Sequence, residues 1–212
     1  MPTFDSVLAF FGVAVLLALS PGPDNIFVLM QSAQHGWRAG MAVVLGLCLG
    51  LVVHTGAVAL GLAAVVAASA LAFTLIKLCG AAYLLWLAWG AWHAPALQQN
   101  PAAGAVAQPD TGALAMVGRG VVMNLSNPKV LLFFMAFLPQ FANPARGPVS
   151  LQIMVFGAVF MLAALLVFGS IACCSGWFGR VLQTSAGAQR VLNRLASAVF
   201  VALAARLASL SR

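Results

Sequence analysis

The stretch SPGPDNIFVLM, Ser20–Met30, interrupts the first long apolar run of the chain with two prolines and a glycine. Asp24 follows at once and is the only acidic residue within the hydrophobic segments. Proline removes a backbone donor and clashes with the preceding helical turn, so this stretch frees several carbonyl and amide groups. Inside a bilayer such groups are tolerated only where they face protein or a water-filled cavity. The stretch therefore predicts either a broken helix at a binding site or a proline kink that only improves packing.

The composition indicates an integral membrane protein. Of the 212 residues, 63% are hydrophobic and 6% are charged, and the mean hydropathy is +1.05. A soluble domain has about 25% charged residues. The net charge of +7 comes from basic residues that stand singly between apolar runs. This pattern favours positive charges flanking membrane helices and argues against nucleic-acid binding.

Charges and turn residues divide the chain into apolar segments. No charged residue occurs between Ala39 and Ile76, a run too long for one span of about 20 residues, so we divide it within Ala63–Phe73. A Pro-, Ala- and Gln-rich passage separates the two halves of the chain. We predict a first three-helix repeat over residues 1–95, a linker over 96–112 and a second three-helix repeat over 113–212. The predicted fold is all-α, with six transmembrane helices in one membrane domain.

Two pairs of motifs indicate an internal repeat. LSPGPD at residues 19–24 resembles LSNPK at 125–129, and KLCGAAY at 77–83 resembles RLASAVF at 194–200. Three crossings in the first half make the second half enter from the opposite side, so the two repeats must be inverted. Helices 1 and 4 of the six would both be broken. Matching breaks in two inverted halves are a pointer to the binding site of a transporter.

Charged and amide side chains cluster at both predicted breaks. Asp24 and Lys129 are costly in a bilayer, so both should face the bundle interior, where each could serve as the counter-ion of the other. That pair could be structural or could bind a solute. Asparagine side chains beside the breaks could bind a ligand or cap the freed backbone. The candidate transport residues are Pro21, Gly22, Pro23, Asp24, Asn25, His54, Lys77, Tyr83, Asn124, Asn127, Pro128 and Lys129.

Three of these candidates lie away from the breaks. His54 continues the spacing of Gly46 and Gly50, and such a stripe of small residues indicates a close helix contact. His54 should therefore face protein, as a proton relay or as a structural side chain. The two glycines fit a homodimer face and a contact within the chain equally well. Lys77 could snorkel to the interface, and Tyr83 could bind a ligand or pack.

Several classes of protein lack support in the sequence. One carboxylate in the hydrophobic segments cannot form a divalent-cation site, and no phosphate-binding GxxxxGK[ST] loop occurs. The four cysteines form no CxxC motif, and we expect them to be small buried hydrophobic residues. We expect no enzyme, no cofactor and no metal. A secondary transporter, a passive channel or a non-transporting membrane subunit remains.

Three segments resemble the signatures of a known family, the LysE/RhtB amino-acid exporters. They are SPGPDNIFVL in the first helix, KLCGAAYLLWL at residues 77–87 and NLSNPKVLLFFMAFLPQF at residues 124–141, and the HGWRAG turn after the first helix is also similar. The resemblance implies a multi-pass protein of the bacterial inner membrane that exports amino acids or their derivatives, driven by protons. It is closer to the RhtB branch, which handles homoserine, threonine and leucine. We expect alternating access, with the substrate between the two breaks, its carboxylate on Lys129 and its ammonium on Asp24.

Overall fold

The computed structural model describes residues 1–20, 22–68, 70–93, 112–175 and 186–209. All regular structure within these ranges is helical, which confirms the predicted all-α class. The helices are α1 (Phe4–Leu19), α2 (Pro23–His35), α3 (Trp37–Ala68), α4 (Ala70–His93), α5 (Ala113–Leu125), α6 (Pro128–Leu132), the π-helix η2 (Phe133–Phe137), the 3₁₀ turns η3 (Leu138–Phe141) and η4 (Pro144–Arg146), α7 (Val149–Cys173) and α9 (Ala186–Ser209). The predicted linker, apart from its last residue, lies outside the described residues.

Both predicted helix breaks are present in the structure. α1 begins at an N-cap, where the Thr3 hydroxyl accepts a hydrogen bond from the amide of Ser6, and it ends at Leu19. α2 restarts at Pro23 and is bent by 62° from α1. α5 and the helical segment that starts at Pro128 are bent by 54°. Proline stands at the first position of each restarted helix, where its missing N–H leaves no hydrogen bond unmade.

The long apolar run divides where the sequence indicated, between α3 and α4. By length and hydropathy, Trp37–Gly61 of α3 and Val149–Cys173 of α7 can each cross a membrane. Each bent pair also meets that test when it is taken as one span, so the described residues hold up to four candidate spans. α4 and α9 have 24 residues each, about 36 Å of helix, which exceeds a hydrocarbon core of about 30 Å. The count of six spans stays a prediction.

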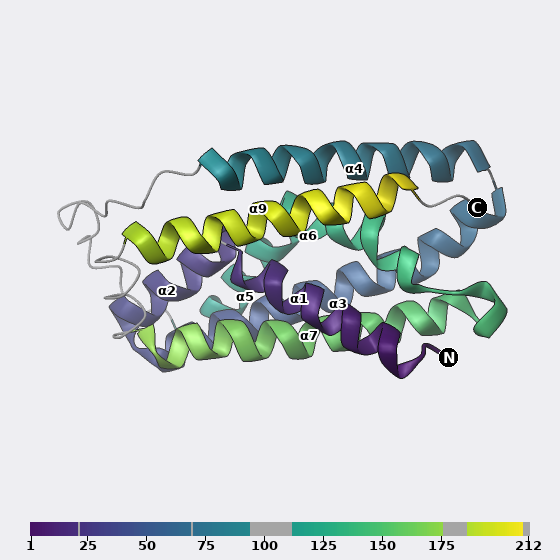
Figure 1. Ribbon diagram of the computed structural model, residues 1–212. Helices are drawn as coiled ribbons and strands as arrows, with labels where there is room; N and C mark the ends of the chain where they lie inside the picture. Colours follow the sequence, from purple (N-terminus) through teal and green to yellow (C-terminus); the bar gives the residue numbers. More distant parts are fainter. Residues whose placement is uncertain (21, 69, 94–111, 176–185, 210–212) are drawn as a thin grey trace.

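The helices lie roughly along one long axis of the molecule (Figure 1). The α1–α2 pair, α3 and α4 run along this axis in alternating directions, and α4 ends at the end opposite the N-terminus. The second half starts there and crosses back through α5 and α6, then α7, then α9. The end of α9 therefore lies at the same end of the molecule as the start of α1 (Figure 1).

The two halves pack intimately against each other. α3 of the first half lies against α5 and α7 of the second, and α1 of the first half lies against α7. α4 and α9 pack side by side along their lengths (Figure 1). The α1–α2 pair is thus covered by α7, and α5 of the second broken pair is covered by α3. Both breaks therefore lie inside the same helix bundle.

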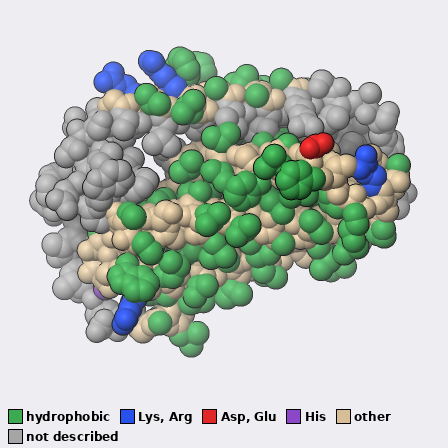
Figure 2. Space-filling view, turned by 60° about the horizontal axis from the view of Figure 1, so that its bottom comes forward, with side chains coloured by type: hydrophobic (Ala, Val, Ile, Leu, Met, Phe, Trp, Pro, Cys, Tyr) green, Lys and Arg blue, Asp and Glu red, His purple; other side chains and the backbone are tan. Residues whose placement is uncertain are grey.

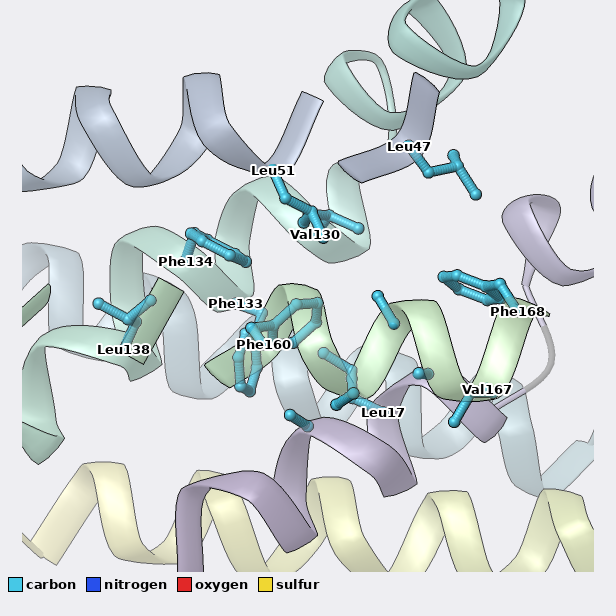
Figure 3. Close-up of a cluster of buried hydrophobic side chains, with 14 of the residues drawn as sticks. Leu17, Leu47, Leu51, Val130, Phe133, Phe134, Leu138, Phe160, Val167 and Phe168 are labelled. Carbon is cyan, nitrogen blue, oxygen red and sulfur yellow. The ribbon is translucent and has the colours of Figure 1, made fainter. Parts of the chain in front are cut away.

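An aromatic cluster fills the core beside the second break. The π-helix turn η2 brings Phe133, Phe134 and Phe137 to the inside, where each is at most 1% exposed. Phe133 lies 5.4 Å from Phe160 of α7 between ring centroids, and Phe10 of α1 lies 6.2 Å from Phe133. Figure 3 shows Phe133, Phe134 and Phe160 among aliphatic side chains such as Leu17 and Leu51. Within a bilayer such rings stabilise the fold through van der Waals packing between helices, because lipid tails are as apolar as the core.

The outer surface suits a bilayer. In the face shown in Figure 2, hydrophobic side chains cover the middle and the charged side chains lie toward the two ends. Large apolar residues such as Phe4, Leu8, Met154 and Leu162 are more than half exposed. A soluble protein rarely exposes an apolar surface of this extent, so the chain is a multi-pass membrane protein.

The expectation that the cysteines are buried is wrong for Cys173 and Cys174, which are both exposed, and Cys48 is half-buried. The last turn of α7 still packs in the core through Ile171 and Ala172, whereas Cys173 lies on its exposed face and Cys174 is the C-cap residue of the helix. The side chain of Cys79 lies outside the described residues.

Candidate functional site

The first break leaves the last carbonyl groups of α1 without partners in their own helix. Two of them, and the carbonyl of the C-cap residue Ser20, accept hydrogen bonds from side chains instead. The amide Nδ2 of Asn25 donates to Ala18 O at 2.7 Å, so the first turn of α2 caps the end of α1 across the bend. The predicted capping role of Asn25 is therefore present in the structure.

The other two carbonyls belong to Leu17 and Ser20, and Lys129 of the second half binds both. Its Nζ lies 3.2 Å from Leu17 O and 3.0 Å from Ser20 O. Lys129 is only 8% exposed. A cation at the C-terminal end of a helix is stabilised by the partial negative charge of the carbonyl groups there. Lys129 thus joins the two breaks, which lie more than 100 residues apart in the sequence.

Gly22 makes room for this ammonium. A Cβ atom on Gly22 would lie 3.0 Å from Lys129 Nζ and 3.7 Å from Asn25 Oδ1. The sequence indicated Gly22 as a helix breaker, but the structure adds that it allows Lys129 to approach. Pro23 is exposed at the start of α2, and Pro21 lies outside the described residues.

The second break is capped by its own asparagine. Asn127 is the N-cap residue of α6, and its Oδ1 accepts a hydrogen bond from the backbone amide of Lys129 at 3.0 Å. Its side chain therefore caps freed backbone, the second role that the sequence left open. Pro128 follows at the first helical position and is exposed.

Asp24 lies in the first turn of α2 and is 2% exposed. The positive end of the helix dipole favours a carboxylate there. Asp24 also interacts electrostatically with Lys129 and lies beside Asn127. The hydrogen bonds of the Lys129 ammonium nevertheless go to the Leu17 and Ser20 carbonyls, so these oxygens share the counter-ion role that we expected of Asp24 alone.

Four buried polar atoms of these two breaks make no hydrogen bond. They are Asp24 Oδ1, Asn25 Oδ1, Asn124 Oδ1 and Asn127 Nδ2, although the Asn127 amide lies close enough to the Asp24 carboxylate to stabilise its charge. A buried polar group without a partner costs about 1–3 kcal/mol, and a charged one costs more. Three of these atoms are hydrogen-bond acceptors and one is a donor. Together they form a candidate binding site for a small solute that offers both donors and acceptors.

His54 lies at the side of this region, on α3. It is 6% exposed, and its Nε2 lies 3.4 Å from the backbone carbonyl of Asn124. Its ring also packs on Phe134 at 5.8 Å between centroids. The prediction that His54 faces protein is confirmed.

The glycine stripe next to His54 is a contact within the chain. A Cβ on Gly46 would lie 2.1 Å from the Val117 carbonyl oxygen, and one on Gly50 would lie 2.6 Å from Asn124 Oδ1. The backbones of α3 and α5 therefore touch. Of the two alternatives that the sequence left open, the structure shows the intramolecular contact.

Two other candidates are not brought to the breaks by any described contact. Tyr83 of α4 is half-buried and stacks on Trp86 at 5.4 Å between centroids, and its hydroxyl makes no hydrogen bond. Lys77 lies in α4, but its side chain is outside the described residues. The described residues hold no group of three or more His, Cys, Asp and Glu side chains that could bind a metal ion.

Sequence reasoning missed the carbonyl groups of Leu17 and Ser20, because backbone ligands carry no residue signature. It also missed Gln152, a buried residue of α7. The side-chain amide Nε2 of Gln152 donates to the carbonyls of Asn143 and Gly147 at 2.9 and 3.0 Å. Gln152 fixes the turn between the second broken helix and α7. The signal available in the sequence was the one amide side chain in a helix whose other polar side chains are serines.

Comparisons with known proteins identify a family for the chain. The family model of the LysE type translocator matches residues 15–211. The homoserine/homoserine lactone efflux protein of Salmonella typhimurium is 33% identical, over 98% of both chains. The leucine efflux protein of Klebsiella pneumoniae is 32% identical, over 93% of this chain and 92% of its own. An uncharacterized membrane protein of Vibrio cholerae is 33% identical, over 92% of both chains.

No solved structure matches the chain. The family match spans most of the chain and includes both helix breaks, together with Lys129 and the aromatic segment that follows it. The members of that family are transporters and not enzymes. The chain belongs to the LysE translocator family.

Proposed function

We propose that this protein is a secondary active transporter that exports amino acids or their derivatives across the bacterial cytoplasmic membrane. The observation that carries the proposal is the pair of helix breaks joined by Lys129, with four unpaired buried polar atoms beside them. The relatives named for efflux of leucine and of homoserine and its lactone support the substrate class.

The unpaired atoms suit an amino acid. Asp24 Oδ1 and Asn25 Oδ1 can accept hydrogen bonds from an ammonium group. Asn127 Nδ2 can donate to a carboxylate, and Lys129 has three N–H donors, of which two are used on the carbonyls of α1. The substrate would lie between the two breaks, with its ammonium toward α2 and its carboxylate toward α6.

Inverted repeats would provide alternating access. The second half passes along the molecule in the direction opposite to the first, and both halves have a broken pair followed by two long helices (Figure 1). The pairing of α4 with α9 and of α3 with α7 is what a two-fold relation between the halves would produce. A rocking of one half against the other would then expose the site to each side in turn.

Protons would drive export, with Asp24 as the first candidate carrier and His54 as the second. The test is uphill export of labelled L-leucine and L-homoserine by the purified protein in proteoliposomes with an imposed proton gradient. We expect accumulation that collapses with a protonophore. Export that only equilibrates the solute would identify a passive channel, and no flux of any solute would identify a non-transporting subunit.

Asp24→Asn separates the two candidate carriers. We expect this variant to lose the dependence of export on the proton gradient, because an amide cannot titrate. Unchanged gradient dependence would exclude Asp24 as the carrier. The same measurement on His54→Gln would then test whether the coupling lies at the histidine.

A further inference from the structure

We infer that the outer edge of the α4–α9 pair binds the phosphate headgroup of an anionic phospholipid, through Arg190 and Arg194 and beside the ring of Trp92. These residues lie on α4 and α9 and belong to neither helix break. The inference is therefore independent of the proposed function, because lipid binding here requires no transport and transport does not require it.

Three exposed tryptophans lie along one side of α4. Trp86, Trp89 and Trp92 are 64%, 69% and 57% exposed, and they follow one another at intervals of three residues, which places them next to each other on a helix. α4 ends at His93, so Trp92 lies in its last turn, at the end of the molecule away from the N-terminus (Figure 1). Tryptophan is enriched at the level of the lipid headgroups, because its ring is apolar and its N–H is polar.

α9 presents two arginines next to this tryptophan stripe. Arg190 and Arg194 are both exposed and lie one helical turn apart. The guanidinium carbon of Arg194 lies 5.4 Å from the centroid of the Trp92 ring, which is a cation–π contact between the two helices. Because α4 and α9 pack side by side, this contact joins the arginines and the end of the tryptophan stripe into one surface (Figure 1).

The positive charge of this surface has no described carboxylate beside it. The three acidic residues of the chain are Asp5, Asp24 and Asp110. Asp5 lies in the first turn of α1 at the opposite end of the molecule, Asp24 is buried at the first break, and Asp110 is outside the described residues. Like charges one helical turn apart repel each other, so an anion that contacts both guanidinium groups would relieve this repulsion.

A phosphodiester in the headgroup layer fits this surface. The planar fork of a guanidinium group matches phosphate oxygens, and two such forks one turn apart can share one phosphate. The acyl chains of the same lipid would pack on the exposed Trp86, Trp89 and Leu195, which a free phosphate ion cannot do. A zwitterionic headgroup carries a cation beside its phosphate, so two arginines attract it less strongly than an anionic headgroup.

Quenching of tryptophan fluorescence by brominated lipids tests this inference. The purified full-length protein is reconstituted into vesicles of phosphatidylcholine with a rising fraction of phosphatidylglycerol, with bromine on the acyl chains of one lipid at a time. Bromine quenches an indole only at short range, so the two series give the association constant of the anionic lipid relative to the zwitterionic lipid. Trp92 is the reporter that contacts Arg194.

We expect phosphatidylglycerol to be preferred by about 10- to 30-fold in the wild type, from about fivefold for each arginine near the membrane surface. The double variant Arg190→Gln/Arg194→Gln should bind both lipids within about twofold of each other. Arg38→Gln is the matched control, because Arg38 lies over the Trp37 ring at 5.6 Å but has no arginine one turn before or after it. This control should change the preference by less than about twofold.

Trp92→Phe is a second variant, which leaves both arginines in place and removes the reporter. It should lower the measured preference, because the remaining tryptophans lie farther from the bound headgroup or outside this surface.

Four results would overturn the inference. Equal quenching by both lipids in the wild type would exclude an anionic site, and an unchanged preference in the double arginine variant would place it elsewhere. Absence of quenching by either lipid would show that another protein surface, such as a second copy of the chain, covers the tryptophans. Loss of the preference on addition of inorganic phosphate at constant ionic strength would assign the arginines to a soluble anion.

Discussion

Replacing Lys129 with Met removes the ammonium that holds the end of α1 against the start of α6. The side chain keeps nearly the same length and apolar character, so the change tests the charge and its hydrogen bonds. The Leu17 and Ser20 carbonyls, now 3.2 and 3.0 Å from Nζ, lose these bonds, and Asp24 loses its neighbouring cation. We expect a folded but destabilised protein that inserts into the membrane and does not export.

The expected loss in the free energy of unfolding follows from the interactions that Lys129→Met removes. Hydrogen bonds of a charged group contribute about 1.5–3 kcal/mol each, and removing one partner of a buried charge pair costs about 3–5 kcal/mol. These terms overlap, so we expect a total loss of about 3–5 kcal/mol. For a chain of this size, about 1 kcal/mol lowers Tm by roughly 2–4 °C, so Tm should fall by about 6–20 °C.

Thermal denaturation of the purified variant in detergent measures this loss, and the proteoliposome assay measures export. Arg146→Met is the matched control, because it removes a basic side chain that is exposed in the turn before α7. Combining Lys129→Met with Asp24→Asn should recover part of the stability, since the uncompensated carboxylate is then also gone. A Tm for Lys129→Met within about 2 °C of the wild type would refute the reasoning.

Three further changes test separate parts of the structure. Gly46→Ala should destabilise the protein by about 1–3 kcal/mol, because the added methyl group overpacks α3 on α5. Gly56→Ala is the control and should be neutral or slightly stabilising, because its Cβ would meet nothing within 4 Å. Equal Tm values for the two variants would contradict the contact between α3 and α5. Gly22→Ala should displace the Lys129 ammonium, because the added Cβ would lie 3.0 Å from its Nζ. We expect a lower export rate and a Tm that falls by no more than a few degrees. Normal export would show that this position of the ammonium is not required. Gln152→Leu should cost about 1–3 kcal/mol, because two backbone carbonyls lose their donor, and an unchanged denaturation curve would argue against this role.

The position of both helix breaks could be predicted from the sequence because proline acts locally. A missing N–H and a ring clash disrupt a helix whatever surrounds it, so Pro23 and Pro128 mark where α2 and α6 begin. Burial of His54 was predictable for a similar reason, since the Gly46 and Gly50 spacing defines one face of a regular helix. The membrane class followed from composition, and the all-α class followed from the length of the apolar runs.

The partner of Lys129 could be determined only from the tertiary structure. Charge complementarity suggested Asp24, but the ammonium is held by two carbonyls of a helix end more than 100 residues away. Backbone carbonyls occur at every residue, so no sequence pattern distinguishes the two that are freed and within reach. The same applies to Asn25, because only the bend between α1 and α2 brings its amide to the Ala18 carbonyl. Local chemistry therefore determined where the chain breaks, and the packing of one half on the other decided what each break binds.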